Sequence, residues 1–321
     1  MNTDGIKKSR GIFAWVRNNN TYLIFVVMVI ACCLLSSNFY SWQNISNLLK
    51  QNTIIGIVAI GMLLVILTGD IDLSVGSIVG ATNVLISVIM SKTSMSIEIA
   101  ILIAILVGIG FGAANGYFIV FRKLPAFIVT LAIMTIARGF AYIWSEGRPI
   151  NVTDPLVKTL NVATPLGLPA IVWFLIVTFV IFLVILRYTS YGRIIKAIGS
   201  NPEAVRLAGL RINNYRFSVY VIVGLLCAIA GFLGCVRTGV GTPLFGSGYE
   251  LDAISMAVIG GASLSGGKGD VVKTIIGIFI IGMISNIMNL TNVSAYLQVV
   301  IQGLIILGAI LLQQSTTKKA A

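Results

Sequence analysis

Residues 61–80 read GMLLVILTGDIDLSVGSIVG, which is an apolar run, a short acidic break, and a second apolar run rich in small residues. The break carries two carboxylates, Asp70 and Asp72. A charged side chain at the centre of a bilayer costs about 2.5–3.5 kcal/mol, so such carboxylates need a partner or a purpose. The stretch therefore predicts two membrane-spanning helices joined by a turn whose carboxylates either cap the second helix or serve a function.

The rest of the chain has the composition of a membrane protein. Its 321 residues are 57% hydrophobic and 10% charged, whereas roughly 25% of the residues in soluble domains are charged. Because a helix needs about 20 apolar residues to cross a bilayer, the chain is predicted to be an all-α integral membrane protein with about ten transmembrane helices. We place these spans at residues 21–37, 53–69, 76–91, 97–120, 126–145, 170–187, 217–236, 253–265, 271–291 and 295–313.

The basic residues predict the orientation of the spans. The formal net charge is +12. If both termini are cytoplasmic, sixteen Lys and Arg residues lie on the cytoplasmic side and five on the other, with Arg138 inside a span. Membrane proteins show this excess in their cytoplasmic loops, so the charge needs no nucleic-acid partner. We therefore expect cytoplasmic tails at residues 1–20 and 314–321 and a single transmembrane domain at 21–313.

A second acidic break, GYELD at residues 248–252, precedes a short, glycine-rich span. The two breaks are expected on opposite sides of the membrane, as they would be if residues 53–145 and 217–313 were inverted repeats. Transporters are often built in this way, with their pathway where the repeats meet.

The carboxylates of the two breaks have two interpretations. Asp72 is placed to cap the third span, and Glu250 and Asp252 to cap the eighth. Alternatively, these carboxylates and Asp70 gate a pathway or contact a partner protein.

Polar and small residues inside the spans suggest packing and pathway positions. Gly108, Gly112 and Gly116 share one helix face and predict close packing within the bundle, with a homodimer contact as the alternative. For Arg138 we expect a structural role, either reaching toward the interface or binding helix carbonyls, with a position lining the pathway as the alternative. Candidate pathway residues are the remaining polar groups within spans, namely Asn83, Asn115, Thr130, Thr135, Asn286, Asn289 and Gln302.

The chain lacks the residues that metal binding and ATP hydrolysis usually require. The chain has no histidine, and its four cysteines show no CxxC spacing, so we expect no metal site and no cofactor. No GxxxxGK[ST] phosphate loop is present, and GGKGD at 266–270 lacks the Ser or Thr and the spacing of one. The chain is therefore predicted not to hydrolyse ATP itself.

The predicted cytoplasmic loop at 188–216 contains a short helix with its own start and stop signals. Asn201 is a good N-cap, Pro202 suits the first helical position, and Gly209 suits the end. Because an isolated helix of about two turns is marginal in water, it should dock against something, either a partner or the membrane surface. Val205 and Leu207 are its candidate contact residues, and the loop site comprises Ser200, Asn201, Pro202, Glu203, Ala204, Arg206, Leu207 and Gly209.

Three stretches resemble a known family. SNPEAVRLAGLRI at 200–212 is similar to the coupling loop of permease subunits of bacterial ABC importers of the ribose and branched-chain amino acid type. GMLLVILTGDIDLSVGSIVG and GYELDAISMAVIGGASLSGGKG at 248–269 resemble signature stretches of its monosaccharide branch, although Val205 and Asp70 depart from residues common in relatives. The resemblance covers about residues 45–312.

The resemblance implies ten helices in a vitamin B12-permease-like arrangement in the bacterial inner membrane. It also implies a second permease subunit, for which we expect a homodimer, a cytoplasmic ABC ATPase and a periplasmic sugar-binding protein. The loop helix would seat in a groove on the ATPase and transmit its closure to the membrane helices.

We therefore predict a non-catalytic permease subunit that moves a small neutral sugar, such as ribose, into the cytoplasm by alternating access. One alternative is an ion-coupled secondary transporter, for which inverted repeats would also be normal. Another is a membrane enzyme that uses Asp70 and Asp72 as a metal-binding pair, although no other acidic cluster lies near them in the sequence.

Overall fold

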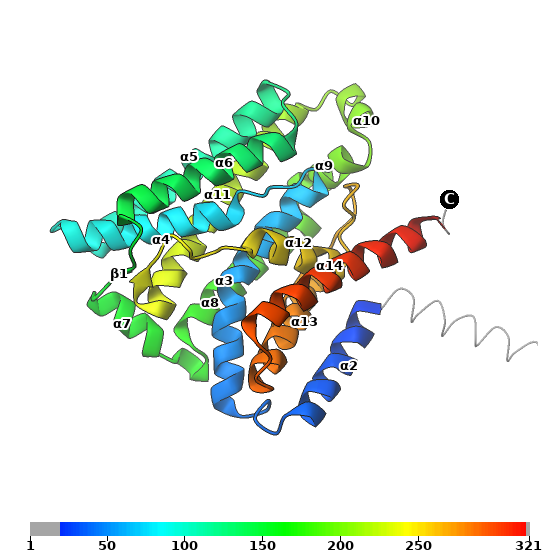
Figure 1. Ribbon diagram of the computed structural model, residues 1–321. Helices are drawn as coiled ribbons and strands as arrows, with labels where there is room; N and C mark the ends of the chain where they lie inside the picture. Colours follow the sequence, from blue (N-terminus) through cyan, green and yellow to red (C-terminus); the bar gives the residue numbers. More distant parts are fainter. Residues whose placement is uncertain (1–19, 319–321) are drawn as a thin grey trace, which may run out of the picture.

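The computed structural model describes residues 20–318, which form a helical bundle with one two-stranded pairing (Figure 1). Seven helices are long and apolar enough to span a membrane, which confirms an all-α membrane protein. They are α3 (Trp42–Leu67), α4 (Val75–Lys92), α5 (Ile97–Gly116) with its π-helical extension Tyr117–Phe121, α6 (Ala126–Ser145), α8 (Ala170–Tyr188), α11 (Ile212–Thr238) and α13 (Val271–Leu290).

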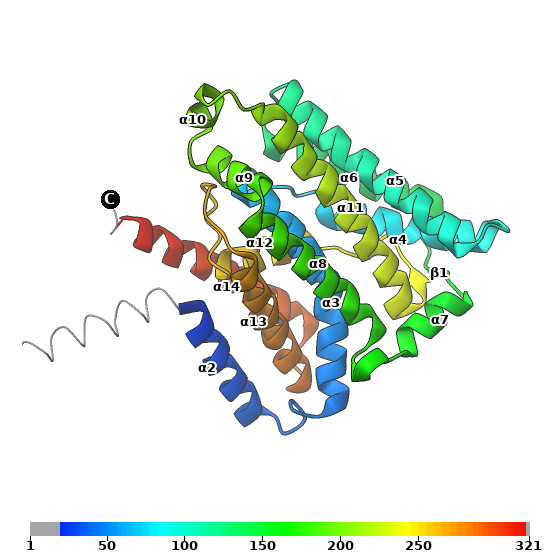
Figure 2. The same cartoon turned by 180° about the vertical axis from the view of Figure 1, so that it is seen from behind.

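The remaining elements are shorter or lie at the ends of the bundle. They are α2 (Asn20–Leu35), β1 (Ile150–Asn151), α7 (Pro155–Val162), a 3₁₀ turn at Pro165–Gly167, α9 (Ser190–Ser200), α10 (Pro202–Leu207), β2 (Val240–Gly241), α12 (Tyr249–Ile259) and α14 (Ala295–Lys318). Helices α9 and α10 lie at one end of the bundle, called here the α10 end. The other, the α7 end, carries α7 and the antiparallel β1–β2 pair (Figures 1 and 2).

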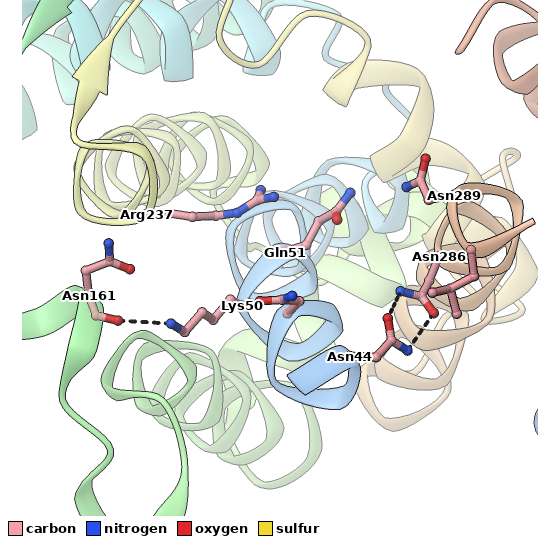
Figure 3. Close-up of a pocket in the computed structure, with 9 residues that line it drawn as sticks. Asn44, Lys50, Gln51, Asn161, Arg237, Asn286 and Asn289 are labelled. Carbon is pink, nitrogen blue, oxygen red and sulfur yellow. Dashed lines mark hydrogen bonds between the residues drawn. The ribbon is translucent and has the colours of Figure 1, made fainter. Parts of the chain in front are cut away.

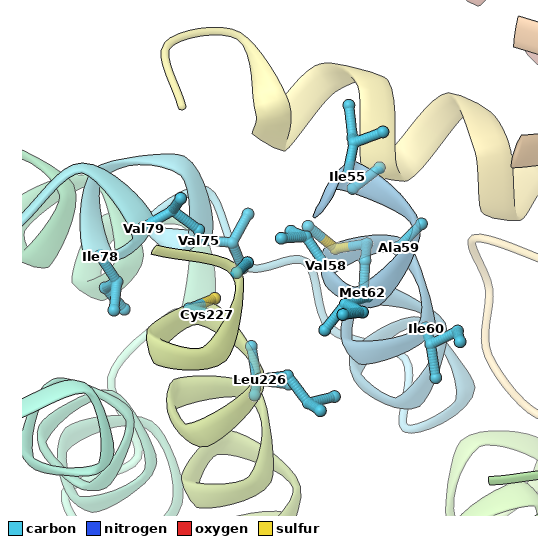
Figure 4. Close-up of a cluster of buried hydrophobic side chains, with 14 of the residues drawn as sticks. Ile55, Val58, Ala59, Ile60, Met62, Val75, Ile78, Val79, Leu226 and Cys227 are labelled. Carbon is cyan, nitrogen blue, oxygen red and sulfur yellow. The ribbon is translucent and has the colours of Figure 1, made fainter. Parts of the chain in front are cut away.

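Helices α3 and α11 form the centre of the bundle. From Asn52 to Leu67 every residue of α3 is buried. Side chains of α3 such as Val58 and Met62 face Val75 of α4 and Leu226 of α11 in the main apolar core (Figure 4). This burial explains why α3 is apolar on all sides, whereas a surface helix has only one apolar face.

The two halves of the chain pack in matching ways. Helix α3 contacts α12 and α13, and α11 contacts α4 and α5. Likewise α4 packs on α5 and α6, and α12 packs on α13 and α14. These four pairs of contacts correspond when α3, α4, α5 and α6 are exchanged for α11, α12, α13 and α14, although the contact between α5 and α6 has no such counterpart of similar size.

Glycines on α5 form a close contact with α11. A Cβ at Gly112 would lie 2.3 Å from the carbonyl oxygen of Tyr220, and one at Gly108 would lie 2.6 Å from that of Gly224. A Cβ at Gly110, by contrast, would meet nothing within 4 Å. The four-residue glycine spacing thus serves packing within the chain, as predicted.

Several predicted boundaries were wrong. The second span starts at Trp42, not at 53, because its polar first turns continue the helix from a Ser41 N-cap. The eighth, predicted at 253–265, is the 11-residue α12, which ends before Gly260 and a Gly261 with φ of +87°. The loop at 188–216 contains α9 as well as α10, because Thr189 caps an additional helix.

Candidate functional site

Helix α10 projects from its end of the bundle and is called here the knob (Figure 1). The Asn201 side chain accepts a hydrogen bond from the Ala204 amide at 3.0 Å, and Pro202 occupies the first helical position, as predicted. Gly209 follows with φ of +77°. The local sequence signals therefore specify both the start and the end of this helix.

The side chains of α10 divide into an inward and an outward set. Val205 is buried, whereas Leu207 is 75% exposed, so of the two predicted contact residues only Leu207 is free to meet a partner. Glu203 and Arg206 form an exposed ion pair with an Nε–Oε2 distance of 2.9 Å, and its hydrogen bonds lower the pKa of Glu203. The exposed face thus offers one large apolar side chain beside a fixed pair of opposite charges.

Helix α9 connects this knob tightly to the bundle. A Cβ at Gly199 would lie 2.0 Å from the carbonyl oxygen of Leu67 and 2.4 Å from the amide nitrogen of Gly267. The Gly267 amide also donates to the Leu67 carbonyl at 3.0 Å. The end of α9 therefore touches both the C-terminus of α3 and the loop between α12 and α13.

The first acidic break, residues 69–76, follows the end of α3 that α9 contacts. Its two carboxylates have different hydrogen-bond partners. Asp70 accepts hydrogen bonds from Arg216 at 2.6 Å and from the Tyr220 hydroxyl at 3.1 Å, both on α11. Asp72 accepts from the backbone amide and the hydroxyl of Ser74, at 2.8 and 2.6 Å. Among the residues that the structure describes, no group of three or more His, Cys, Asp or Glu side chains is placed to hold a metal ion.

Asp72 accepts a hydrogen bond from the backbone at the start of α4, but it is not the N-cap that the capping interpretation expected. Ser74 is the formal N-cap residue, and its hydroxyl also accepts a hydrogen bond from Asn115 of α5 at 2.8 Å. Burial raises the pKa of Asp72 to about 6, although its hydrogen bonds from Ser74 act in the opposite direction. Asn115 therefore contributes to this buried network.

The irregular segment between α11 and α12, residues 239–248, is largely non-helical and leads into the second acidic break. Its backbone meets the start of α4, since a Cβ at Gly76 would lie 2.2 Å from the carbonyl oxygen of Gly246. Arg138 of α6 donates to the carbonyl oxygens of Pro243 and, at 3.0 Å, of Phe245. The structural role expected for Arg138 is thus to hold non-helical backbone within the bundle.

The carboxylates that follow this segment are not caps, which rules out the capping interpretation for Glu250 and Asp252. Gly248 is the N-cap of α12, and no side chain caps this helix. Glu250 and Asp252 lie within its first turn, where negative charge is favoured by the helix dipole. One oxygen of each is buried without a hydrogen-bond partner, Oε2 of Glu250 and Oδ1 of Asp252.

A cavity of about 480 Å³ opens beside this helix start. Its lining comes from α4, α6, the irregular segment and α12, namely Ser77, Met134, Thr135, Arg138, Gly139, Tyr142, Ser247, Gly248 and Glu250. Thr135 is therefore the one predicted pathway residue that lies in this cavity. Glu250, expected as a cap, gate or contact residue, lies there too.

The other predicted pathway residues are dispersed. Asn83 is fully buried, donating to the Gly231 carbonyl at 3.2 Å and accepting from the Thr242 amide at 3.0 Å. Thr130 is buried and donates to a carbonyl of its own helix, that of Phe127. Asn83 therefore holds the segment at residues 239–248 against α4.

Asn286 and Asn289 line a second, polar pocket of about 440 Å³ near the N-terminus of α3 and the C-terminus of α13 (Figure 3). Asn286 and Asn44 exchange two side-chain hydrogen bonds, at 2.7 and 3.0 Å. Lys50 donates to the Asn161 carbonyl at 3.0 Å. The other lining residues are Asn47, Gln51, Arg237 and Leu290, so the pocket has two cations and no carboxylate.

The family model for the branched-chain amino acid transport system / permease component matches residues 44–310. The chain belongs to this permease family. It is 36% identical over 304 residues to the ribose import permease protein RbsC of Escherichia coli K12, which covers 93% of this chain and 94% of that protein.

Two other members of the permease family support the same assignment. The L-arabinose transport system permease protein AraH of Escherichia coli K12 is 37% identical, with 99% of this chain and 98% of that protein covered. The ribose import permease protein RbsC of Bacillus subtilis is 38% identical, with 94% and 92% covered. No solved structure gives a significant match.

Proposed function

We propose that this chain is the membrane permease subunit of an ABC importer for a small neutral sugar of the ribose or arabinose class. The observation that carries the proposal is the match to ribose and arabinose permeases over more than nine tenths of each chain. The exposed, internally capped α10 supports coupling to an ATPase and not to an ion gradient. This chain would hold no cofactor, and a separate ABC ATPase would hydrolyse the ATP.

The contacts of α9 and α10 suggest how a partner's movement reaches the membrane helices. Helix α10 would seat on the cytoplasmic ATPase through Leu207 and the Glu203–Arg206 pair. From there one route runs through Gly199 to the end of α3. A second runs along the chain to α11, where Arg216 is paired with Asp70 of the first break.

The α10 end would be cytoplasmic, together with both chain termini. The seven long helices, α2, α14, and the irregular segment combined with α12 make ten crossings. The matching contacts of α3–α6 and α11–α14 support inverted repeats in a vitamin B12-permease-like arrangement. The polar pocket at the α7 end would then face the periplasm, where a sugar-binding protein would deliver the cargo.

A second copy of this chain would complete the pathway. Among the helices that the structure describes, α6 packs mainly on α4, α5 and the π-helical extension of α5. The cavity that contains Arg138 and Glu250 opens beside it. Charged groups facing lipid are costly, which favours a protein partner over this face.

The test is the association of the solubilised permease with its ABC ATPase, followed by sugar-stimulated ATP hydrolysis in lipid nanodiscs. We expect Leu207→Asp to abolish association, because it places a carboxylate on the exposed apolar part of the knob. Leu166→Asp is the matched control, since Leu166 is 89% exposed near the opposite end of the bundle. Uptake that is unaffected by Leu207→Asp but abolished by an uncoupler would instead support an ion-coupled transporter.

A further inference from the structure

Two glycines on α4 lie close to a pair of oppositely charged side chains, which line the 480 Å³ cavity. A Cβ at Gly76 would lie 2.4 Å from Oε2 of Glu250, and one at Gly80 would lie 2.7 Å from a guanidinium nitrogen of Arg138. The two glycines are one helical turn apart. The nearest atoms at the two positions are backbone carbonyl oxygens, that of Gly246 at 2.2 Å and that of Phe245 at 2.6 Å, so the glycines let residues 239–248 pack on α4 with the two charged groups beside them.

The side chains of Arg138 and Glu250 both line the cavity but do not form an ion pair with each other. Three ion pairs occur in the part of the chain that the structure describes, and none joins Arg138 to Glu250. Arg138 uses one of its terminal nitrogens for the Pro243 and Phe245 carbonyls, which leaves further donors on the same group. Glu250 has an oxygen without any hydrogen-bond partner.

The cavity lies within the bundle at the start of the short helix α12. Thr135 and Arg138 lie near the middle of α6, and Ser247 and Gly248 form the break that starts α12. Transporters commonly place their substrate at the start of such a discontinuous helix, near the middle of the membrane. Ligand sites usually have volumes of about 300–1,000 Å³, a range that includes this cavity.

We propose that this cavity is a transient binding site for the cargo, in which Glu250 accepts hydrogen bonds from sugar hydroxyl groups and Arg138 donates to sugar oxygens. The proposal rests on the proposed function. A separated cation and anion have no net charge, so together they offer donors and acceptors to an uncharged polyhydroxylated molecule. Ser77, Thr135, Ser247 and the Tyr142 hydroxyl add groups that both donate and accept.

The test measures protection of a cysteine in the cavity, in the assembled transporter. Cys33, the exposed native cysteine, is first replaced by Ser, and Thr135→Cys is introduced into that background. A water-soluble methanethiosulfonate should modify this cysteine, and tens of millimolar ribose or arabinose should slow the reaction several-fold. Adding Glu250→Gln should raise the sugar concentration needed for protection at least tenfold, because hydrogen bonds to a charged group are the strong ones.

Asp252→Asn is the matched control, because Asp252 lies in the same turn of α12 but does not line the cavity. It should leave protection unchanged. Equal protection in Glu250→Gln, or protection by leucine and not by sugars, would overturn the proposal. If the ATPase still associates and responds to sugar while the cysteine is never protected, the cavity assignment fails and the proposed function stands.

Discussion

Single residues at the two breaks show what their sequence could and could not predict. Asn201 and Gly209 occupy the local positions expected of them, because capping depends on neighbours within three residues, whereas the N-cap of α4 is Ser74 and not Asp72. Asp270 obeys the same rule at the start of α13, where its carboxylate accepts from the amides of Val272 and Lys273, although we had not identified it. The Asp70–Arg216 pair was not predictable, because its partners lie 146 positions apart.

We expect the Asp70–Arg216 pair to show strong energetic coupling in reversible unfolding in mixed micelles. Both side chains are mostly buried, with 13% and 27% of their surfaces exposed, so water screens their attraction poorly. A double-mutant cycle of Asp70→Asn and Arg216→Gln should give an interaction energy of about 1–3 kcal/mol. The exposed Glu203–Arg206 pair is the control and should show a weaker coupling, of no more than about 0.5 kcal/mol. Additive effects at Asp70 and Arg216 would remove this link from the proposed coupling route.

At the scale of elements, most of the long apolar helices were predictable, and so was the short α10, whereas α9 and the start of α3 were not. The third to sixth spans agree with the structure to within one residue, because their apolar runs end at polar or proline-containing turns. Helix α9 was missed, although Thr189 and the spacing of Ile195 and Ile198 now account for it as a short amphipathic helix. The 29-residue segment at 188–216 contains one helix with clear start and stop signals, α10, and a second helix, α9, whose signals were not recognised.

The contact between α5 and α11 should tolerate no side chain at Gly112. We expect Gly112→Leu to separate the two helices and to abolish stable accumulation of the protein in the membrane, since even its Cβ would collide with the backbone of α11. Gly110→Leu is the control on the same helix, where the space is open, and should accumulate normally. Normal levels and thermal stability of the Gly112 variant would show that α11 can shift away without loss.

At the scale of the whole molecule, the sequence predicted a membrane bundle with related halves but not where a cargo would pass. Candidate pathway residues were chosen because they are polar and lie within spans. That criterion cannot separate Asn83, which fastens backbone, from Thr135, which lines the cavity. The separation depends on which helix faces meet, and those contacts join segments far apart in the sequence.

The same contacts leave α6 covered on one side only, and this leads to a prediction about assembly. Ile136, next to the cavity residue Thr135, is 47% exposed, and Val177 on α8 is 54% exposed. Lipid can cover the apolar side chain of Val177. Lipid next to Ile136 would also cover the cavity that contains Arg138 and Glu250, and exposing these charged groups to lipid is costly. In the Cys33→Ser background, Ile136→Cys should therefore crosslink between two copies in native membranes with a short bifunctional reagent, whereas Val177→Cys should not. If only Val177→Cys crosslinks, the subunits meet through α8, and the cavity beside α6 would have to be closed by some other partner.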